Sequence, residues 1–205
     1  MNNTIFKPTT EYRELLILNA ISNKPNVTQR ELAIITELSI GSINLVLDEY
    51  TNSGFIEKQE INSKSYKYIL SKSGKKELKY LSMNLIKATL DMYNNAKQEC
   101  IRYLKELVSD GFKKIILYGA GKVCELILHV IYENKDLGIN VIGIADDDLN
   151  KVGEELYGFD VMGLDQIGLN KFDCVLITSY DHLDKMKENI CEYNVSPRKI
   201  KSYFE

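Results

Sequence analysis

The sequence predicts an α+β domain, then a helical linker, then an α/β domain with a five-stranded parallel sheet. Three observations predict this order. Residues 10–72 carry three short helical patterns followed by two strand-like runs. Residues 74–109 contain no proline and, after Gly74, no glycine, so they favour helix. From residue 113 onward, apolar strand-like runs alternate with helical patterns, as in a parallel sheet with crossover helices.

A chain of 205 residues is long enough for two small domains, each with its own hydrophobic core. We place the α+β domain at residues 1–73, the linker at 74–110 and the α/β domain at 111–205. The sequence contains no apolar run of about 18 residues and no secretory signal pattern, so we expect no membrane span and a cytoplasmic location. Four scattered cysteines and two histidines predict neither a zinc site nor a disulfide framework.

The first domain shows the plan of a winged helix-turn-helix. Residues 11–22 place their apolar side chains on one helical face. Thr28 followed by Glu31 has the spacing of a capping box, which begins a second helix. Ser39 begins a third helix, and a hairpin over residues 55–70 completes the domain. Three helices and a hairpin in this order predict that the third helix lies in the DNA major groove and that the hairpin forms the wing.

Residue types in these places suit contacts with DNA. Hydroxyl and amide groups at helix starts can bond bases or phosphates, and lysines on the wing can bind phosphates. The predicted DNA contacts are Thr28, Gln29, Ser39, Gly41, Ser42 and Asn44 on the helices, and Lys58, Lys64 and Lys67 on the wing. Residues 1–82 have a net charge of +2 and residues 111–205 one of −5, which favours the first domain as the partner of DNA. The alternative is a winged helix that contacts other proteins.

Residues 28–57, together with the segment YKYILSKSGKKEL, resemble the MarR-type winged-helix regulators associated with exopolysaccharide gene clusters. The resemblance implies a DNA-binding transcriptional regulator with a wing that leads into a long helix. This chain departs from the pattern because its third helix has no lysine or arginine and carries Asp48 and Glu49.

The linker carries an apolar stripe with spacings of three and four residues. The stripe consists of Tyr93, Ala96, Cys100, Leu104 and Leu107. A long helix with such a stripe needs a partner surface, so we predict a homodimer seam; the alternative is packing against the chain's own domains. The pattern does not decide between one helix and two.

The α/β domain contains a candidate phosphate-binding turn. Gly119-Ala120-Gly121 lies between a predicted strand and a predicted helix, where small residues let the backbone approach a phosphate. Asp146 ends the next strand, where a carboxylate binds ribose hydroxyls. Cys124 occupies the third glycine position, which predicts a poor fit for a full dinucleotide. The alternative is that the glycines only form a tight turn.

The segments ILYGAGKVCELIL, VIGIADDDLNKVGEELYGFDVMG and FDCVLITS resemble the nucleotide-binding domains of polysaccharide-biosynthesis epimerases and dehydratases. The resemblance implies that a cofactor or nucleotide is held by Gly119, Ala120, Gly121, Lys122, Val123 and Asp146, and Thr178 and Ser179 are expected to face the same crevice. Candidate ligands are NAD(H), NADP(H) or a nucleotide sugar. The whole arrangement also resembles redox-sensing repressors that join a winged helix to an NADH-binding Rossmann domain.

These observations predict a ligand-responsive DNA-binding regulator with a Rossmann-like sensing domain, and not an enzyme. Catalysis on this fold usually needs a second half or a substrate domain that closes over the cofactor, and the predicted fifth strand has none after it. The spacing of Tyr118 and Lys122 matches that of short-chain dehydrogenases, but both residues flank the phosphate turn, so we regard it as chance. The alternatives are a nucleotide-sugar or NAD(P)-dependent enzyme or subunit, and a non-catalytic protein-interaction module.

Overall fold

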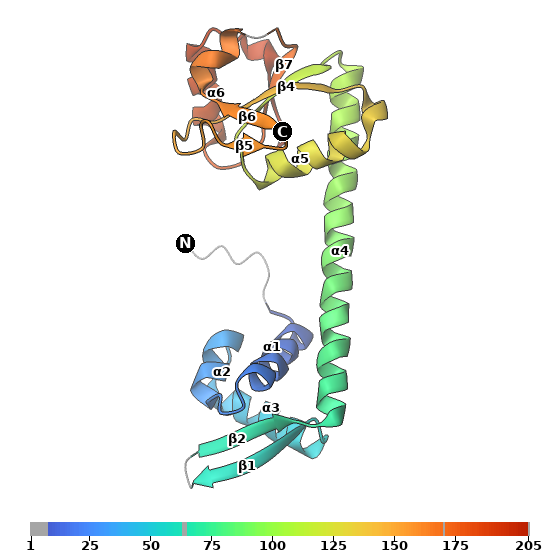
Figure 1. Cartoon of the computed structure of the whole chain (residues 1–205), viewed down its shortest axis with the longest axis vertical. Coiled ribbons are helices and arrows are strands. Elements are labelled where there is room, and N and C mark those ends of the chain that lie inside the picture. The colour runs from blue at the N-terminus through green and yellow to red at the C-terminus, as the bar shows by residue number, and fades with distance from the viewer. Residues whose placement is uncertain (1–7, 63–64, 170, 205) are drawn as a thin grey trace. The chain divides into compact units, whose positions relative to one another are not determined.

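The computed structural model describes residues 8–62, 65–169 and 171–204 (Figure 1). The chain forms two compact units, the first ending at Met92 and the second beginning at Tyr93. This division falls inside the segment predicted as a linker, so each unit includes part of it.

The first unit confirms the predicted order of three helices and a hairpin. Its elements are α1 (Thr10–Asn23), α2 (Gln29–Thr36), α3 (Ile40–Asn52), β1 (Ile56–Asn62), β2 (Ser65–Leu70) and the first part of α4 (Lys72–Ser109). The two strands pair antiparallel. Local sequence explains these boundaries: Thr28 and Ser39 cap α2 and α3 as predicted, and Gly54, with φ +71°, ends the turn after α3.

Apolar faces of the three helices and the hairpin pack into one core. The largest fully buried side chains there are Ile17, Leu18, Ile21, Leu32, Ile43, Leu47 and Tyr68. Leu81 of α4 is also buried in this core. The helix-turn-helix and the wing are therefore held by the same set of apolar contacts, with α3 packed by one face only.

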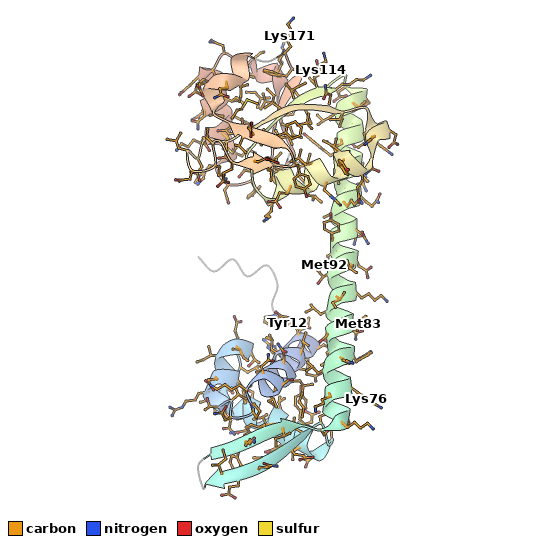
Figure 2. The ribbon with its side chains drawn as sticks, viewed as in Figure 1. Tyr12, Lys76, Met83, Met92, Lys114 and Lys171 are labelled. Atoms are coloured by element: carbon orange, nitrogen blue, oxygen red, sulfur yellow. The ribbon has the colours of Figure 1, made fainter. Side chains whose placement is uncertain are left out.

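The predicted linker segment is one continuous helix, α4. After Leu81 its side chains become exposed, and large apolar ones stand at Met83, Ile86, Leu90 and Tyr93. Figure 2 shows Met83 and Met92 on this part of the helix. Met83, Ile86, Leu90 and Tyr93 follow one another at spacings of three, four and three residues, which places them on one stripe of the helix.

The second unit contains a six-stranded mixed sheet, which corrects the prediction of five parallel strands. Its elements after α4 are β3 (Lys114–Tyr118), α5 (Lys122–Glu133), η1 (Lys135–Leu137), β4 (Asn140–Ala145), β5 (Glu155–Leu156), β6 (Phe159–Met162), η2 (Leu164–Leu169), β7 (Cys174–Ile177), α6 (Leu183–Glu192), η3 (Pro197–Lys199) and β8 (Ile200–Ser202). The strand order is β5-β6-β4-β3-β7-β8, and only the β5–β6 pair is antiparallel.

The overlooked strand β5 belongs to a hairpin with a two-residue turn. Tyr157 and Gly158 both have positive φ, at 53° and 81°, as the tight turns of β-hairpins require. β5 has two residues, too few for a strand pattern, and tyrosine is not a typical residue for the first turn position. The sequence signal was therefore weak.

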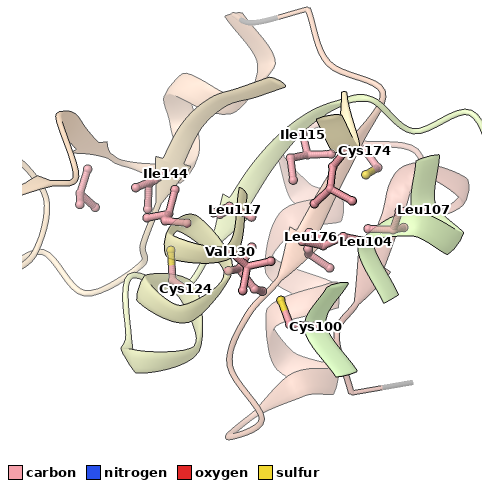
Figure 3. Close-up of a cluster of buried hydrophobic side chains, with 14 residues drawn as sticks. Cys100, Leu104, Leu107, Ile115, Leu117, Cys124, Val130, Ile144, Cys174 and Leu176 are labelled. Atoms are coloured by element: carbon pink, nitrogen blue, oxygen red, sulfur yellow. The ribbon is translucent and has the colours of Figure 1, made fainter. Parts of the chain in front are cut away.

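Helices cover both faces of the second unit's sheet. On one face, α5 and the end of α4 pack against side chains of β3, β4 and β7, as the labelled residues of Figure 3 show. On the other face, Met186 and Ile190 of α6 pack with Ile167 of η2 against alternate strand residues. This three-layer arrangement buries β3 and β7 on both sides, as is typical of parallel strands.

Three residues of the predicted dimer stripe belong to this core instead. Cys100, Leu104 and Leu107 are buried against β3, α5 and β7. The prediction of a seam is wrong for these three residues, because the second unit's own sheet covers them. Tyr93 and Ala96 remain exposed.

No helix among the described residues is both long enough and apolar enough to cross a membrane. Within the same ranges, no group of three or more histidine, cysteine, aspartate or glutamate side chains is placed to hold a metal ion.

The first turn of α4 approaches the backbone before β1 very closely at Gly74. A Cβ there would lie 2.0 Å from the carbonyl oxygen of Phe55, which is backbone and cannot turn aside. We therefore expect Gly74→Ala to lower the free energy of unfolding by about 1–3 kcal/mol. Gly41→Ala is the matched control, because its Cβ would meet only Ser39 Oγ at 3.7 Å. It should be neutral or stabilising by up to about 1 kcal/mol. Urea unfolding that gave equal stabilities would contradict this packing.

Candidate functional site

A tight turn follows β3, where the sequence predicts a phosphate-binding loop. Gly119 has φ +107°, a backbone conformation that favours glycine. A Cβ at Gly119 would lie 3.3 Å from Oγ1 of Thr178, so the turn is also closely packed. Gly121 is the N-cap of α5 and gives no side-chain cap to the helix. The first amides of α5 are thus left to an acceptor from outside the helix.

The carboxylate of Asp146, at the end of β4, holds this turn. Asp146 is 3% exposed. Its Oδ2 accepts hydrogen bonds from the Ala120 amide at 2.7 Å and from Nζ of Lys151 at 2.9 Å. Its Oδ1 accepts from the Asp148 amide at 2.9 Å. The hydrogen bond to Asp146 raises the pKa of Lys151 above its ordinary value. The residue predicted to bind ribose therefore already anchors the turn in this structure.

Thr178 holds the turn from the end of β7. Its hydroxyl donates to the carbonyl oxygen of Gly119 at 2.6 Å and lies 3.0 Å from that of Tyr118. Its amide donates to the Tyr118 carbonyl at 2.8 Å. The ends of three strands, β3, β4 and β7, are therefore joined by side-chain hydrogen bonds around one turn.

A pocket of about 410 Å³ opens at the carboxyl ends of these strands. Ligands of open α/β sheets bind at this edge. The predicted residues that line the pocket are Gly119, Gly121, Lys122, Val123, Asp146, Thr178 and Ser179. Ala120 is not among the lining residues, and its amide donates to Asp146. The structure thus gathers seven of the eight predicted residues around one space.

The pocket also has residues that the sequence analysis did not identify. They are Asp147, Lys151, Tyr180, Asp181, His182, Met186 and Phe204. Lys151 follows the acidic run Asp146–Asp148 closely, which was an available signal. The rings of Tyr180 and Phe204 have centroids 5.6 Å apart, a contact between distant parts of the sequence that no local pattern shows.

Cys124, on the first turn of α5, is buried beneath the pocket's turn. Burial raises the pKa of its thiol to about 12. A thiol with so high a pKa remains protonated at neutral pH and is a poor nucleophile. Cys124 therefore acts as a packing residue of the helix.

The predicted DNA contacts at α2 take part in its capping. Thr28 accepts from the Glu31 amide, and Glu31 Oε2 accepts from the Thr28 amide at 2.8 Å, which completes the predicted capping box. A hydrogen bond from Lys24, followed by those from Thr28, lowers the pKa of Glu31 to about 2. Nε2 of Gln29 donates to the Tyr68 hydroxyl at 3.3 Å, which joins α2 to the wing.

The predicted contacts at α3 lie on its first turns. Ser39 Oγ accepts from the Ser42 amide at 3.0 Å and lies 2.8 Å from Ser42 Oγ. Gly41 is exposed, and Ser42 and Asn44 are half-buried. These four residues lie together at the start of one helix.

The wing lysines differ in their surroundings. Nζ of Lys58 lies 3.3 Å from Oδ1 of Asp48 and 4.5 Å from the centroid of the Tyr66 ring. Lys67 is exposed. Lys64 lies outside the described residues. Of the two described wing lysines, Lys67 is the more available to a phosphate, since Lys58 is already paired.

A second recess, of about 720 Å³, lies in the first unit between the helix starts and the wing. It is lined by Asn26, Val27, Thr28, Gln29, Arg30, Ile40, Ile61, Tyr66 and Tyr68. Arg30 is exposed and was not among the predicted contacts, although it directly follows two of them. It adds a cation at the start of α2.

Two family models match parts of the chain. Residues 11–57 match the model described as winged helix-turn-helix DNA-binding. Residues 111–201 match the model described as C2185-like, N-terminal. No curated protein matches the chain significantly. The two descriptions name neither exopolysaccharide regulators nor epimerases, so those resemblances remain predictions.

Solved structures similar to the chain include a MarR family protein of Mycobacterium tuberculosis in complex with salicylic acid, at 20% identity and a TM-score of 0.37, over 48% of this chain and 74% of that one. They also include RSP, a Rex-family repressor, at 16% identity and a TM-score of 0.37, over 93% and 80%. MepR, a regulator of the Staphylococcus aureus efflux pump MepA, is similar at 17% identity and a TM-score of 0.35, over 51% and 82%. Scores this low do not establish a shared fold.

The hydrogen bonds of Asp146 predict two different costs of mutation. Asp146→Ala leaves the Ala120 and Asp148 amides without their acceptor, and we expect a loss of about 2–3 kcal/mol in the free energy of unfolding. Lys151→Met removes only the ion pair, and Lys151 has a side chain 39% exposed, where water screens the interaction. Its expected cost is about 1 kcal/mol. Urea unfolding of both variants measures the difference, and an equal or larger loss for Lys151→Met would contradict the anchoring role.

Proposed function

We propose that the chain is a ligand-responsive transcriptional regulator that binds DNA through its winged-helix unit and a nucleotide-type ligand through the pocket over β3, β4 and β7. The observation that carries this proposal is the presence, in one chain, of a helix-turn-helix with an exposed third helix and of a glycine turn that opens into a pocket. Each unit supports one half of the function.

The first half rests on the arrangement of α2, α3 and the wing. The second helix of a helix-turn-helix enters the major groove with its first residues toward the bases. Ser39, Gly41, Ser42 and Asn44 would then contact bases or nearby phosphates. Arg30 and Lys67, both exposed, would contact the phosphate backbone on either side. The match of residues 11–57 to a DNA-binding family model supports the same assignment.

The second half rests on the turn at Gly119–Gly121. A helix start without a side-chain cap favours an anion. Lys122 and Lys151 also line the pocket, and a phosphate would draw them from their present carboxylate partners, Glu125 at 2.8 Å and Asp146 at 2.9 Å. A nucleotide places its phosphate there, with Tyr180 and Phe204 available as aromatic surface for the base. Candidate ligands are NAD(H), NADP(H) and nucleotide sugars. Because the second unit's sequence resembles polysaccharide-biosynthesis proteins, we also propose that the regulated genes belong to polysaccharide or nucleotide-sugar metabolism.

A homodimer is also part of the proposal. Met83, Ile86, Leu90 and Tyr93 form an exposed apolar stripe on α4 with coiled-coil spacing. Exposed apolar stripes of this kind are covered by partners in stable proteins. The same stripe of a second copy would cover it and would place two winged helices for two half-sites of an operator.

The proposal gives the pocket a sensing role. Its buried carboxylate, Asp146, is committed to the turn, and the buried thiol of Cys124 has a raised pKa, so neither group suits acid–base or nucleophilic chemistry. An enzyme or enzyme subunit remains the alternative, and it predicts turnover of a nucleotide sugar or a nicotinamide cofactor.

Charge reversal on the wing tests DNA binding. We expect Lys67→Glu to weaken binding to a duplex from the gene's own promoter region and to lower the slope of log affinity against log salt by about one unit. Lys171→Glu, an equal charge change at an exposed position of the second unit, should leave both unchanged. Fluorescence anisotropy over a series of salt concentrations measures these slopes. Equal slopes for the wild type and Lys67→Glu would contradict the role of the wing.

A carboxylate at Gly121 tests the phosphate site. A Cβ there meets nothing within 4 Å, and aspartate is a preferred N-cap, so Gly121→Asp should stabilise the ligand-free protein by about 0.5 kcal/mol. The same carboxylate would occupy the place of the phosphate. We therefore expect the thermal shift caused by NAD(H), NADP(H) or a nucleotide sugar to disappear.

The gain in stability controls for folding in this variant. A variant that is stabilised but still shows the wild-type thermal shift would contradict a phosphate at this helix start. An absence of any shift in the wild type with these compounds and coenzyme A would contradict the proposed ligand class.

A further inference from the structure

The exposed face of α3 carries an apolar side chain at its centre. The side of α3 packed into the core consists of Ile43, Leu47 and Tyr50. With about 100° of rotation per residue, Gly41, Leu45 and Asp48 lie on the opposite side. Leu45 is 73% exposed, whereas leucine side chains in folded domains are among the most often buried. No described residue of the chain covers it.

The same face carries no free cation. The residues of α3, all of them described, include no lysine or arginine. Asp48 and Glu49 are both exposed on this side, and both lie in the later part of the helix. Nζ of Lys58 lies 3.3 Å from Asp48, so the wing offsets part of this negative charge. The first two turns, with Gly41, Asn44 and Leu45, present a neutral surface to a groove.

We infer that Leu45 contacts the 5-methyl groups of thymine in the major groove, so that the preferred duplexes are rich in A·T pairs beneath the start of α3. This inference rests on the DNA-binding function proposed above. Thymine is the base that presents a methyl group in the major groove, and guanine is recognised there chiefly by arginine or lysine, which α3 lacks. A partner protein would also cover a leucine, but α3 is the helix that a helix-turn-helix places in the major groove. Beside its first residue, Ile40, the start of α2 and the wing line a recess with Arg30 at its edge, which suits a phosphate backbone.

Neighbouring residues agree with this chemistry. Gly41 lies one helical turn before Leu45 and has no side chain, which leaves room for a methyl group beside the leucine. The side-chain amide of Asn44 can bond N6 and N7 of adenine, the partner of thymine in the same pair. Ser39 and Ser42 are bonded to each other and add no charge. Methyl and amide contacts on adjacent residues thus recognise the two sides of one A·T pair.

Removal of the methyl groups alone tests the inference. Duplexes are selected by the full chain from a pool with a randomised centre, and an enriched duplex is synthesised once with thymine and once with uracil. Burial of one methyl group corresponds to about a fourfold change in affinity. We expect the uracil duplex to bind about fourfold more weakly for each methyl contacted. In Leu45→Ala this difference should vanish, because the contacting side chain is gone.

Leu149→Ala is the matched control, since Leu149 is 86% exposed and lies in the second unit. It should keep the full difference between thymine and uracil. Urea unfolding should show that neither variant is destabilised, because both side chains are largely exposed. Equal affinity for the two duplexes in the wild type, or enrichment of G·C-rich sequences, would overturn the inference while the DNA-binding function stands. A failure to bind any duplex at low salt would overturn both.

Discussion

The buried carboxylate of Asp146 is the constraint on which the pocket of the second unit depends. A carboxylate that is 3% exposed needs hydrogen-bond donors to compensate for the water it has lost. Asp146 meets this condition through the amides of Ala120 and Asp148 and the ammonium of Lys151, and in doing so it fixes the glycine turn. In the proposed function, a ribose hydroxyl would either compete with Lys151 at Oδ2 or use the acceptor site that remains on Oδ1. The proposed ligand site and the order of the turn therefore depend on the same side chain.

Helix α4 imposes a second constraint, because one uninterrupted helix supplies buried residues to two cores. Leu81 belongs to the core of the winged-helix unit, and Cys100 and Leu104 belong to the core of the sheet. The proposed coupling between ligand and DNA has to pass through this helix, because it is the segment of the chain that joins the two units.

The sequence predicted those features that local chemistry determines. The capping box at Thr28 and Glu31, the strand after Ser65 and the glycine turn after Tyr118 all depend on residues close together in the chain. The hairpin at Tyr157 was missed because two-residue strands carry no periodicity. The stripe containing Leu104 and Leu107 was assigned to a dimer, because a seam and a core share the same spacing. The commitment of Asp146 to the turn, and the pairing of Lys58 with Asp48, depend on side-chain positions that no spacing rule supplies.

The most direct test of this account is the affinity for DNA with and without ligand. The dissociation constant of the full chain for a selected duplex is measured alone and at a saturating concentration of the nucleotide that gives the largest thermal shift. The account predicts a change of at least about fivefold, and an equal change in nucleotide affinity when DNA is bound. A chain that binds both partners with affinities independent of each other would contradict it.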